Sequence, residues 1–227
     1  MMRYNIFNQI HKGLRALLYD TALKIQQTDF AAPEEAASVL EQTQMVLDFF
    51  DGHAAHEDHF ILPAIEAYEP DTVMVFEQEH GEDHALAEKL RGLISAYQHA
   101  LSTDGKLELG NSINVHFVSF MVFNLEHMAK EEKILNRALW KYYSDAEIMA
   151  INKKIVMALP AEQLVNGNVW MMRGLNDAEL AAWMKAVQRS EAAPMLPGLL
   201  ELAEKQLNQK RFEKLSSRLT EGALLAS

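Results

Sequence analysis

The sequence predicts an all-α protein, in which an up-down-up-down four-helix bundle is followed by several shorter helices. Three observations predict this fold class. Apolar residues make up 49% of the 227 residues, which is enough to build a substantial core. Proline and glycine are scarce, at six and ten residues, so long uninterrupted elements are expected. Apolar side chains recur at helical spacing, and no stretch alternates in the manner of a β-strand.

Four long helices are expected in the first domain, residues 1–143, at about 4–28, 34–68, 72–101 and 107–143. The links between them are short and contain proline, glycine, serine or aspartate, which end helices. Short links between helices of similar length indicate antiparallel neighbours. Pro63 falls late in the second helix, where it predicts a kink or an early end.

The remaining residues, 144–227, are expected to form a C-terminal extension of short helices, packed on the bundle or at an oligomer interface. Ser144 and Glu147 have the spacing of a capping box, which marks the start of a helix. Asn176 and Glu179 repeat this spacing. The methionines around residue 171 are expected to fill the core of this region or to form a soft binding surface, and its tryptophans to anchor the helices against the bundle or a second subunit. These residues are Met171, Met172, Met184, Trp170 and Trp183.

Charge, cysteine content and hydropathy exclude several classes of protein. The chain carries 21 basic and 32 acidic residues, for a formal charge of −11, so it lacks the basic surface that a nucleic-acid partner needs. It contains no cysteine, which excludes disulfides, cysteine-bound zinc and iron–sulfur clusters. No apolar run reaches the roughly 18 residues that span a bilayer, and the N-terminus does not resemble a secretory signal. We therefore expect a cytoplasmic protein with neither a membrane nor a nucleic-acid partner.

Seven residues able to bind a metal lie on the four expected long helices. Three of these helices carry them in pairs four residues apart, a spacing that places both side chains on one face, about 6 Å apart along the axis. Each set interrupts an apolar face of its helix. The seven candidate ligands are His11, His53, Glu57, His80, His84, His127 and Glu131.

These residues predict a metal centre because unpaired carboxylates are costly to bury, and bound cations offset that cost. The alternative is that each histidine is an ordinary core residue hydrogen-bonded to a carboxylate, which the agreement among four helices disfavours. Imidazole and carboxylate suit iron, manganese or zinc, and the absence of sulfur ligands removes the softer metals. If both glutamates and an oxide or hydroxide bridge two octahedral ions, one position stays open for a small molecule such as dioxygen, nitric oxide or a peroxide.

The other histidines have weaker claims to a role in the site. His56 points about 60° away from His53, so it either orients a ligand or lies at the edge of the core. His116 either lines a channel or is an ordinary residue at the rim of the bundle. His59 and His99 are expected at the surface.

The order and spacing of the candidate ligands resemble the hemerythrin family, in particular the bacterial HHE cation-binding domains. The resemblance covers about residues 3–143 and includes the sequence around the ligands of the first two helices, at residues 11–15 and 56–63. It implies a hemerythrin-like bundle around two iron ions that are joined by an oxide or hydroxide. Family members bind dioxygen, sense oxygen or iron, handle nitric oxide damage, or store and deliver iron.

One departure from the family pattern bears on function. Oxygen-carrying hemerythrins end on His-x-x-x-x-Asp, whereas this chain has His127-x-x-x-Glu131, which argues against reversible oxygen carriage. We expect a binding protein rather than an enzyme. Its ligand would be a small diatomic molecule or a peroxide, and its role sensing, protection or iron handling. The alternatives are a di-iron enzyme, either peroxidase-like or active in iron–sulfur cluster repair, and a regulatory module that responds to iron or oxygen. A homodimer through the C-terminal helices is also expected.

Overall fold

The computed structural model describes residues 3–224, which form helices joined by short links, with no strand among them. Contacts divide the described residues into two compact units. The bundle unit comprises the residues up to Asn8 together with Leu17–Leu159, and the C-terminal unit comprises Gln9–Ala16 together with the residues from Pro160 onward. Helix α1 (Asn8–Gln27) therefore contributes to both units.

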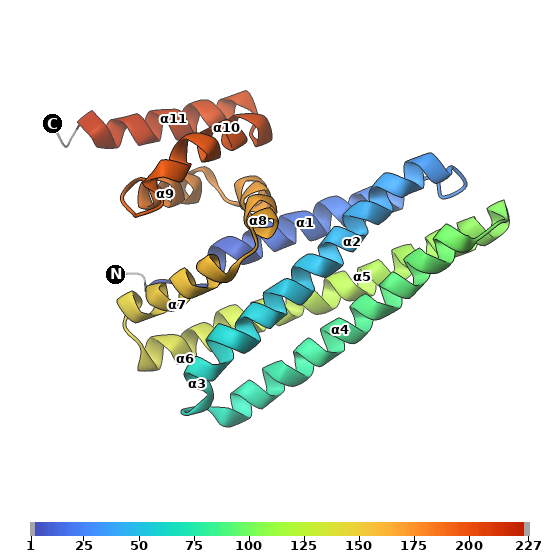
Figure 1. The fold of residues 1–227 in the computed structure, drawn as a ribbon, viewed down its shortest axis with the longest axis horizontal. Helices are drawn as coiled ribbons and strands as arrows, with labels where there is room; N and C mark the ends of the chain where they lie inside the picture. Colours follow the sequence, from blue (N-terminus) through green and yellow to red (C-terminus); the bar gives the residue numbers. More distant parts are fainter. Residues whose placement is uncertain (1–2, 225–227) are drawn as a thin grey trace. The chain divides into compact units, whose positions relative to one another are not determined.

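The bundle unit is built on long helices that run alternately in opposite directions. They are α2 (Pro33–His56), α4 (Pro70–His99) and α5 (Thr103–Lys133), together with the part of α1 that starts at Leu17 (Figure 1). Helices α4 and α5 lie side by side along their length (Figure 1). The predicted all-α bundle is confirmed.

Local signals fix where these helices start. Pro33 and Pro70 occupy the first positions of α2 and α4, where the missing N–H of proline has no helical partner to lose. The Ser102 side chain caps α5 by accepting a hydrogen bond from the N–H of Gly105 at 3.1 Å. These starts lie within a few residues of the predicted ones.

Helix α1 starts about four residues later than the predicted start at residue 4. The Asn5 side chain accepts hydrogen bonds from the N–H groups of Phe7 and Asn8, both at 3.0 Å. An asparagine that satisfies the first free N–H groups of a helix marks its beginning. Apolar spacing alone could not show that this asparagine acts as a cap.

The interruption expected at Pro63 lies one turn earlier and is a π turn. Helix α2 passes into a π-helix, η1 (Glu57–Ile61), and then into α3 (Leu62–Glu66). The N–H of Leu62 bonds to the carbonyl of Glu57, five residues back. The wider turn lets the chain stay helical through a residue that has no N–H to donate.

The fourth predicted helix is two helices. Helix α5 ends at Lys133, and α6 (Leu135–Tyr142) follows after Ile134, whose φ of −99° and ψ of −58° depart from helical values. No proline or glycine occurs at this break, so it could not be predicted from residue type or apolar spacing.

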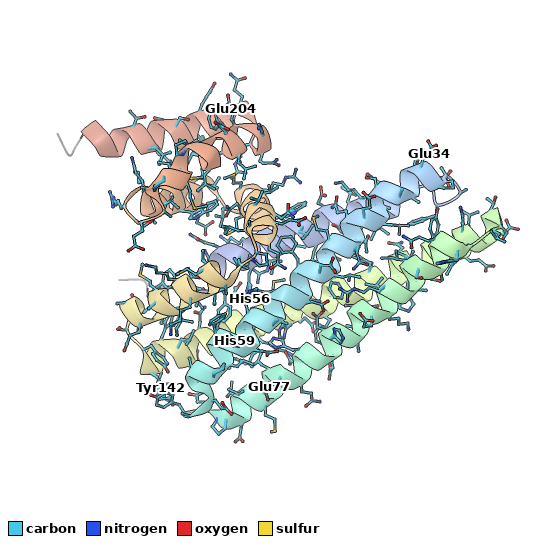
Figure 2. The ribbon with its side chains drawn as sticks, in the orientation of Figure 1. Glu34, His56, His59, Glu77, Tyr142 and Glu204 are labelled. Carbon is cyan, nitrogen blue, oxygen red and sulfur yellow. The ribbon has the colours of Figure 1, made fainter. Side chains whose placement is uncertain are left out.

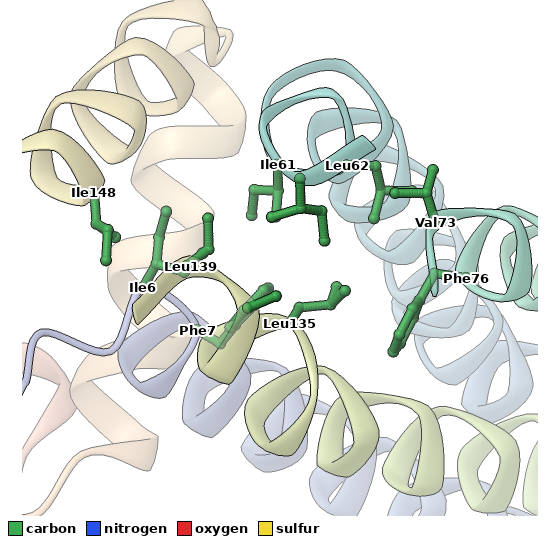
Figure 3. Packing of buried hydrophobic residues seen from close by; sticks show 11 residues of the cluster. Ile6, Phe7, Ile61, Leu62, Val73, Phe76, Leu135, Leu139 and Ile148 are labelled. Atoms are coloured by element: carbon green, nitrogen blue, oxygen red, sulfur yellow. The ribbon is translucent and has the colours of Figure 1, made fainter. Parts of the chain in front are cut away.

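Helix α7 (Asp145–Ala158) begins with the predicted capping box, in which the Ser144 hydroxyl accepts from the N–H of Glu147 and the Glu147 carboxylate accepts from the N–H of Ser144. Ile148 of α7 is fully buried in a cluster of the bundle unit, which places α7 in that unit (Figure 3). The two units consequently part after Leu159, whereas the sequence suggested a boundary after residue 143.

The cluster in Figure 3 closes one end of the bundle unit. It joins side chains from the start of the chain with those of η1, α3, α4, α6 and α7. Its labelled members are Ile6, Phe7, Ile61, Leu62, Val73, Phe76, Leu135, Leu139 and Ile148. This cluster holds the π turn against the first residues of α4 and against α6.

The C-terminal unit has its own apolar core. Beyond residues 9–16 it contains α8 (Ala161–Gly174), α9 (Asp177–Gln188), η2 (Ala193–Met195), α10 (Leu196–Gln206) and α11 (Gln209–Leu224). Met172 and Met184 are fully buried in it, which confirms the expected role of methionine as a core filler. The predicted capping box of Asn176 and Glu179 opens α9. Among the described residues, none of the helices combines the length and apolar content that a membrane span requires.

Candidate metal centre

Four buried donor residues of the bundle unit come together beside the π turn. Glu57 lies at the first position of η1, His80 lies on α4, and His127 and Glu131 lie one turn apart on α5. Each offers a ligand atom within 4.8 Å of the others, and none is more than 7% exposed. Three of the predicted ligand-bearing helices thus contribute to one group.

Both imidazoles of this group direct Nε2 toward the carboxylates. His127 Nε2 lies 2.8 Å from a Glu131 oxygen. His80 Nε2 lies 3.4 Å from Oε2 of Glu57 and 3.7 Å from Oε1 of Glu131. The two rings meet edge to face, with centroids 5.0 Å apart. The inward atoms are therefore two nitrogens and two carboxylate groups.

His53 extends the donor set along α2. Its Nε2 lies 3.1 Å from Oε1 of Glu57, one helical turn away, and its side chain is 13% exposed. The predicted four-residue steps of the second and fourth helices thus place their two donors together, as expected for residues on one face of a helix.

The outward nitrogen of each buried imidazole contacts a second carboxylate. His80 Nδ1 lies 2.6 Å from Asp58, and His127 Nδ1 lies 2.8 Å from Glu79, which Lys130 also contacts at 2.6 Å. Such a contact orients the ring and fixes which nitrogen is free to bind a metal. Sequence analysis missed Asp58 and Glu79, because each supports a histidine on a different helix.

These carboxylates control the charge of the two imidazoles. Burial lowers the pKa of His80, but the neighbouring carboxylates of Glu131, Glu57 and Asp58 outweigh it and raise the pKa to about 11. Burial also lowers the pKa of His127, and Glu131 and Glu79 again outweigh it, so that this pKa is raised. The donor set consequently attracts positive charge.

Aromatic side chains surround the donor set on α4 and α5. The Phe123 ring stacks on His127 with centroids 5.9 Å apart, and the Phe76 ring lies 5.7 Å from it. Asp83 is 3% exposed and accepts a hydrogen bond from the Asn124 amide at 2.6 Å. Burial raises the pKa of Asp83. This second buried polar layer was also missed in the sequence.

His84 lies apart from the group, at the surface of α4. Its side chain is 64% exposed, and its Nδ1 lies 3.3 Å from Asp51. The buried residues of α4 recur at alternating steps of three and four: Val73, Phe76, His80, Asp83, Ala87, Leu90, Ile94 and Tyr97. This period of 3.5 places Asp83 in the interior, whereas a period of 3.6 had suggested His84.

His11 is fully buried and lies on the segment of α1 that belongs to the C-terminal unit. It is described below with that unit. The prediction that it is a metal ligand stays a prediction.

Three of the remaining histidines bond to carbonyl groups of their own helices. Nδ1 of His56 contacts the carbonyl of Gly52, and His116 and His99 make the same contact with Ser112 and Ser95, both at 2.7 Å. His56 and His59, labelled in Figure 2, mark the end of α2 and the π turn. The expectation that His59 and His99 are exposed is confirmed.

A cavity of about 260 Å³ opens between α4 and α5 and reaches the outer side of His127. Its lining is mostly charged or polar, with one apolar side chain from each of the two helices. The lining residues are Val75, Gln78, Glu79, Glu82, Phe123, Glu126, His127 and Lys130.

The donor set fits a bound metal ion. Two buried carboxylates and two imidazoles, joined by His53, are the nitrogen and oxygen donors that iron, manganese and zinc accept. Burying two carboxylates this close together is costly unless positive charge accompanies them. Asp58 and Glu79 leave Nε2 of His80 and His127 as the nitrogens that face a metal.

The chain was compared with protein families, with curated proteins and with solved structures. The model of the family described as hemerythrin HHE cation binding domain matches residues 2–139. No match was found among curated proteins or among solved structures.

Proposed function

The chain belongs to the hemerythrin HHE cation-binding family, and from this premise we propose that it holds two iron ions and uses them to bind a small ligand. The ligand class is dioxygen, nitric oxide or a peroxide, and the role is sensing, protection or iron handling. An oxygen bridge between the ions is part of the proposal. Manganese or zinc are the less favoured metals for this donor set.

The proposed ligands start from Glu57, His80, His127 and Glu131. One observation carries the proposal: the donor atoms of these four residues lie within 4.8 Å of one another, and all four residues are buried. His53 joins them through its 3.1 Å contact with Glu57. We propose His11 as a further ligand from the spacing of the sequence. His84 would have to leave Asp51 to take part.

A bound iron pair would supply reversible binding or electron transfer for a small molecule. The residues of the chain would do the rest. Asp58 and Glu79 hold the rings of His80 and His127 in place, and the rings of Phe76 and Phe123 pack beside that of His127. We propose binding rather than turnover, and the donor set disfavours a hydrolase in particular, because it holds no nucleophile or general base apart from these ligands.

The proposal is tested by elemental analysis of protein purified without added metal, followed by absorption spectra before and after exposure to air. We expect about two iron ions per chain in the wild type. Glu57→Ala and Glu131→Ala should each lower the content toward one ion per chain. His99→Ala is the matched control, because His99 is exposed and bonds to its own helix. Equal iron content in all four proteins would refute the proposed site.

Two further predictions concern the whole chain. We propose a cytoplasmic location and a homodimer through the C-terminal helices. Light scattering of the purified protein tests the dimer: a mass of about one chain, 25.7 kDa, would contradict it.

A further inference from the structure

Two glycines allow α1 and α8 to meet backbone to backbone within the C-terminal unit. A Cβ atom on Gly174 would lie 2.2 Å from the carbonyl oxygen of Lys12, and one on Gly13 would lie 3.0 Å from the backbone nitrogen of Met171. Both obstacles are backbone atoms, which cannot move aside as a flexible side chain can. The turn of α1 at residues 12–13 is therefore held directly by the end of α8.

An ion pair ties the same turn to α9. The Lys12 ammonium contacts the Glu179 carboxylate, and both side chains are less than one-third exposed. Glu179 is also the residue that closes the capping box of α9, because its carboxylate accepts from the N–H of Asn176 at 3.0 Å. One side chain thus connects α1 to the start of α9.

The corner between α8 and α9 is linked in turn to α11. Arg211 donates to Asp177 at 2.8 Å and also to the carbonyl of Leu175. Leu175 and Leu215 are both buried in the core of the unit. A shift or rotation of the α1 turn would therefore disturb a connected set of contacts from α8 to α11.

His11 precedes Lys12 on this turn. We call the contacts of Lys12 and Gly13 with α8 and with Glu179 of α9 the clasp. We propose that the C-terminal unit regulates the metal centre through residues 9–16 of α1. Metal binding at His11 fixes the turn and stabilises α8 and α9, and an intact clasp raises metal affinity. This inference rests on the proposed function, because His11 must be a metal ligand. The coupling is reciprocal, since any factor by which the clasp changes metal affinity is the factor by which metal changes the clasp.

The test uses the full chain with ferrous iron under anaerobic conditions and measures amide hydrogen exchange in α8 and α9. In the wild type, iron should slow this exchange about tenfold, within the usual range of coupling between sites. Gly174→Ala should abolish the slowing and weaken iron binding by a similar factor, because its Cβ would meet the Lys12 backbone. Gly198→Ala on α10 is the matched control, since nothing lies within 4 Å of its added Cβ.

Two more variants distinguish loss of the clasp from misfolding and from loss of the His11 ligand. Glu179→Gln removes the charge that pairs with Lys12 but can still close the capping box, so it should reduce the coupling even if Gly174→Ala folds poorly. His11→Ala should keep the clasp and abolish the effect of iron on α8 and α9.

The outcomes distinguish this inference from the proposed function. If the wild type takes up iron, but exchange in α8 and α9 is unchanged and Glu179→Gln binds iron like the wild type, the regulatory role is refuted and the metal centre stands. If the wild type takes up no iron, both are refuted.

Discussion

The two ends of the bundle unit use the same helices for different purposes. At the end near the α1–α2 link, the Tyr97 ring meets the Phe30 ring edge-on with centroids 5.6 Å apart, and its hydroxyl donates to the Phe30 carbonyl at 2.8 Å. Gly110 lets the Phe30 ring lie against α5, because a Cβ there would be 2.2 Å from the ring. The Tyr97 hydroxyl is thus paired with the backbone.

The donor end lies about 25 Å away along α4, measured from Tyr97 to His80 at 1.5 Å per residue. There, Glu57, His80, His127 and Glu131 fill interior positions that elsewhere hold apolar side chains. Ordinary packing explains the first end, whereas the second needs positive charge, from protonated histidines or bound cations, to balance its carboxylates. The comparison teaches that one pair of long helices can keep packing and metal binding at separate levels.

Removing the metal should change the stability of the bundle unit more than any substitution described below. At metal concentrations of 100 to 1,000 times Kd, binding adds about 3 to 4 kcal/mol to the free energy of unfolding. Chelation should therefore lower the Tm of the bundle unit by roughly 6 to 16 °C. Calorimetry with and without chelator measures this shift. An unchanged Tm would mean that the donor end is an ordinary core.

Substitutions of His80 and His84 test which histidines of α4 bind the metal. His80→Ala should raise the metal Kd by at least about 100-fold, equivalent to about 2.7 kcal/mol, because its Nε2 faces both buried carboxylates. His84→Ala should leave the Kd nearly unchanged, because this side chain is exposed beside Asp51. Competition with a chromophoric chelator measures both constants. Equal losses would show that His84 turns inward to bind.

Gly110→Ala tests the packed end. The added Cβ would overlap the Phe30 ring, so we expect a loss of about 1 to 3 kcal/mol in stability, with metal content unchanged. Gly92→Ala on α4 is the control: nothing lies within 4 Å of its Cβ, and it should add about 0.5 to 1 kcal/mol. Denaturant unfolding gives both values, and a loss of metal in Gly110→Ala would show that the two ends are coupled.

Tyr97→Phe should have the smallest effect. It removes the hydrogen bond to the Phe30 carbonyl and keeps the ring contact, so the expected loss is about 1 kcal/mol. Denaturant unfolding measures the loss, and elemental analysis should find the metal content of the wild type. A larger loss of stability would mean that the hydroxyl also supports other contacts.

Much of the fold follows from local signals in the sequence. The proline starts of α2 and α4 and the two capping boxes depend on residues within one turn, so they could be predicted. The break at Ile134 and the cap formed by Asn5 could not, because neither is marked by apolar spacing or by proline and glycine.

The candidate site was predictable where one helical turn joins two donors, as for His53 with Glu57 and His127 with Glu131. It was not predictable on the long helix α4, where the buried residues repeat every 3.5 residues. A period of 3.6 would place His84 in the interior, whereas a period of 3.5 places Asp83 there. The carboxylates that orient His80 and His127 come from other helices, so no spacing within one helix could reveal them.

The π turn at Glu57–Ile61 changes the direction in which the side chains of α3 point relative to those of α2. It contains one residue more than an α turn would, which lets Glu57 face the donors while Ile61, Leu62 and Ile65 still reach the apolar cluster. If the same residues were wound as an unbroken α-helix, with none deleted, everything after them would rotate by about 100° relative to α2. The insertion of one amino acid thus reconciles a carboxylate and a hydrophobic surface that an unbroken helix would have set against each other.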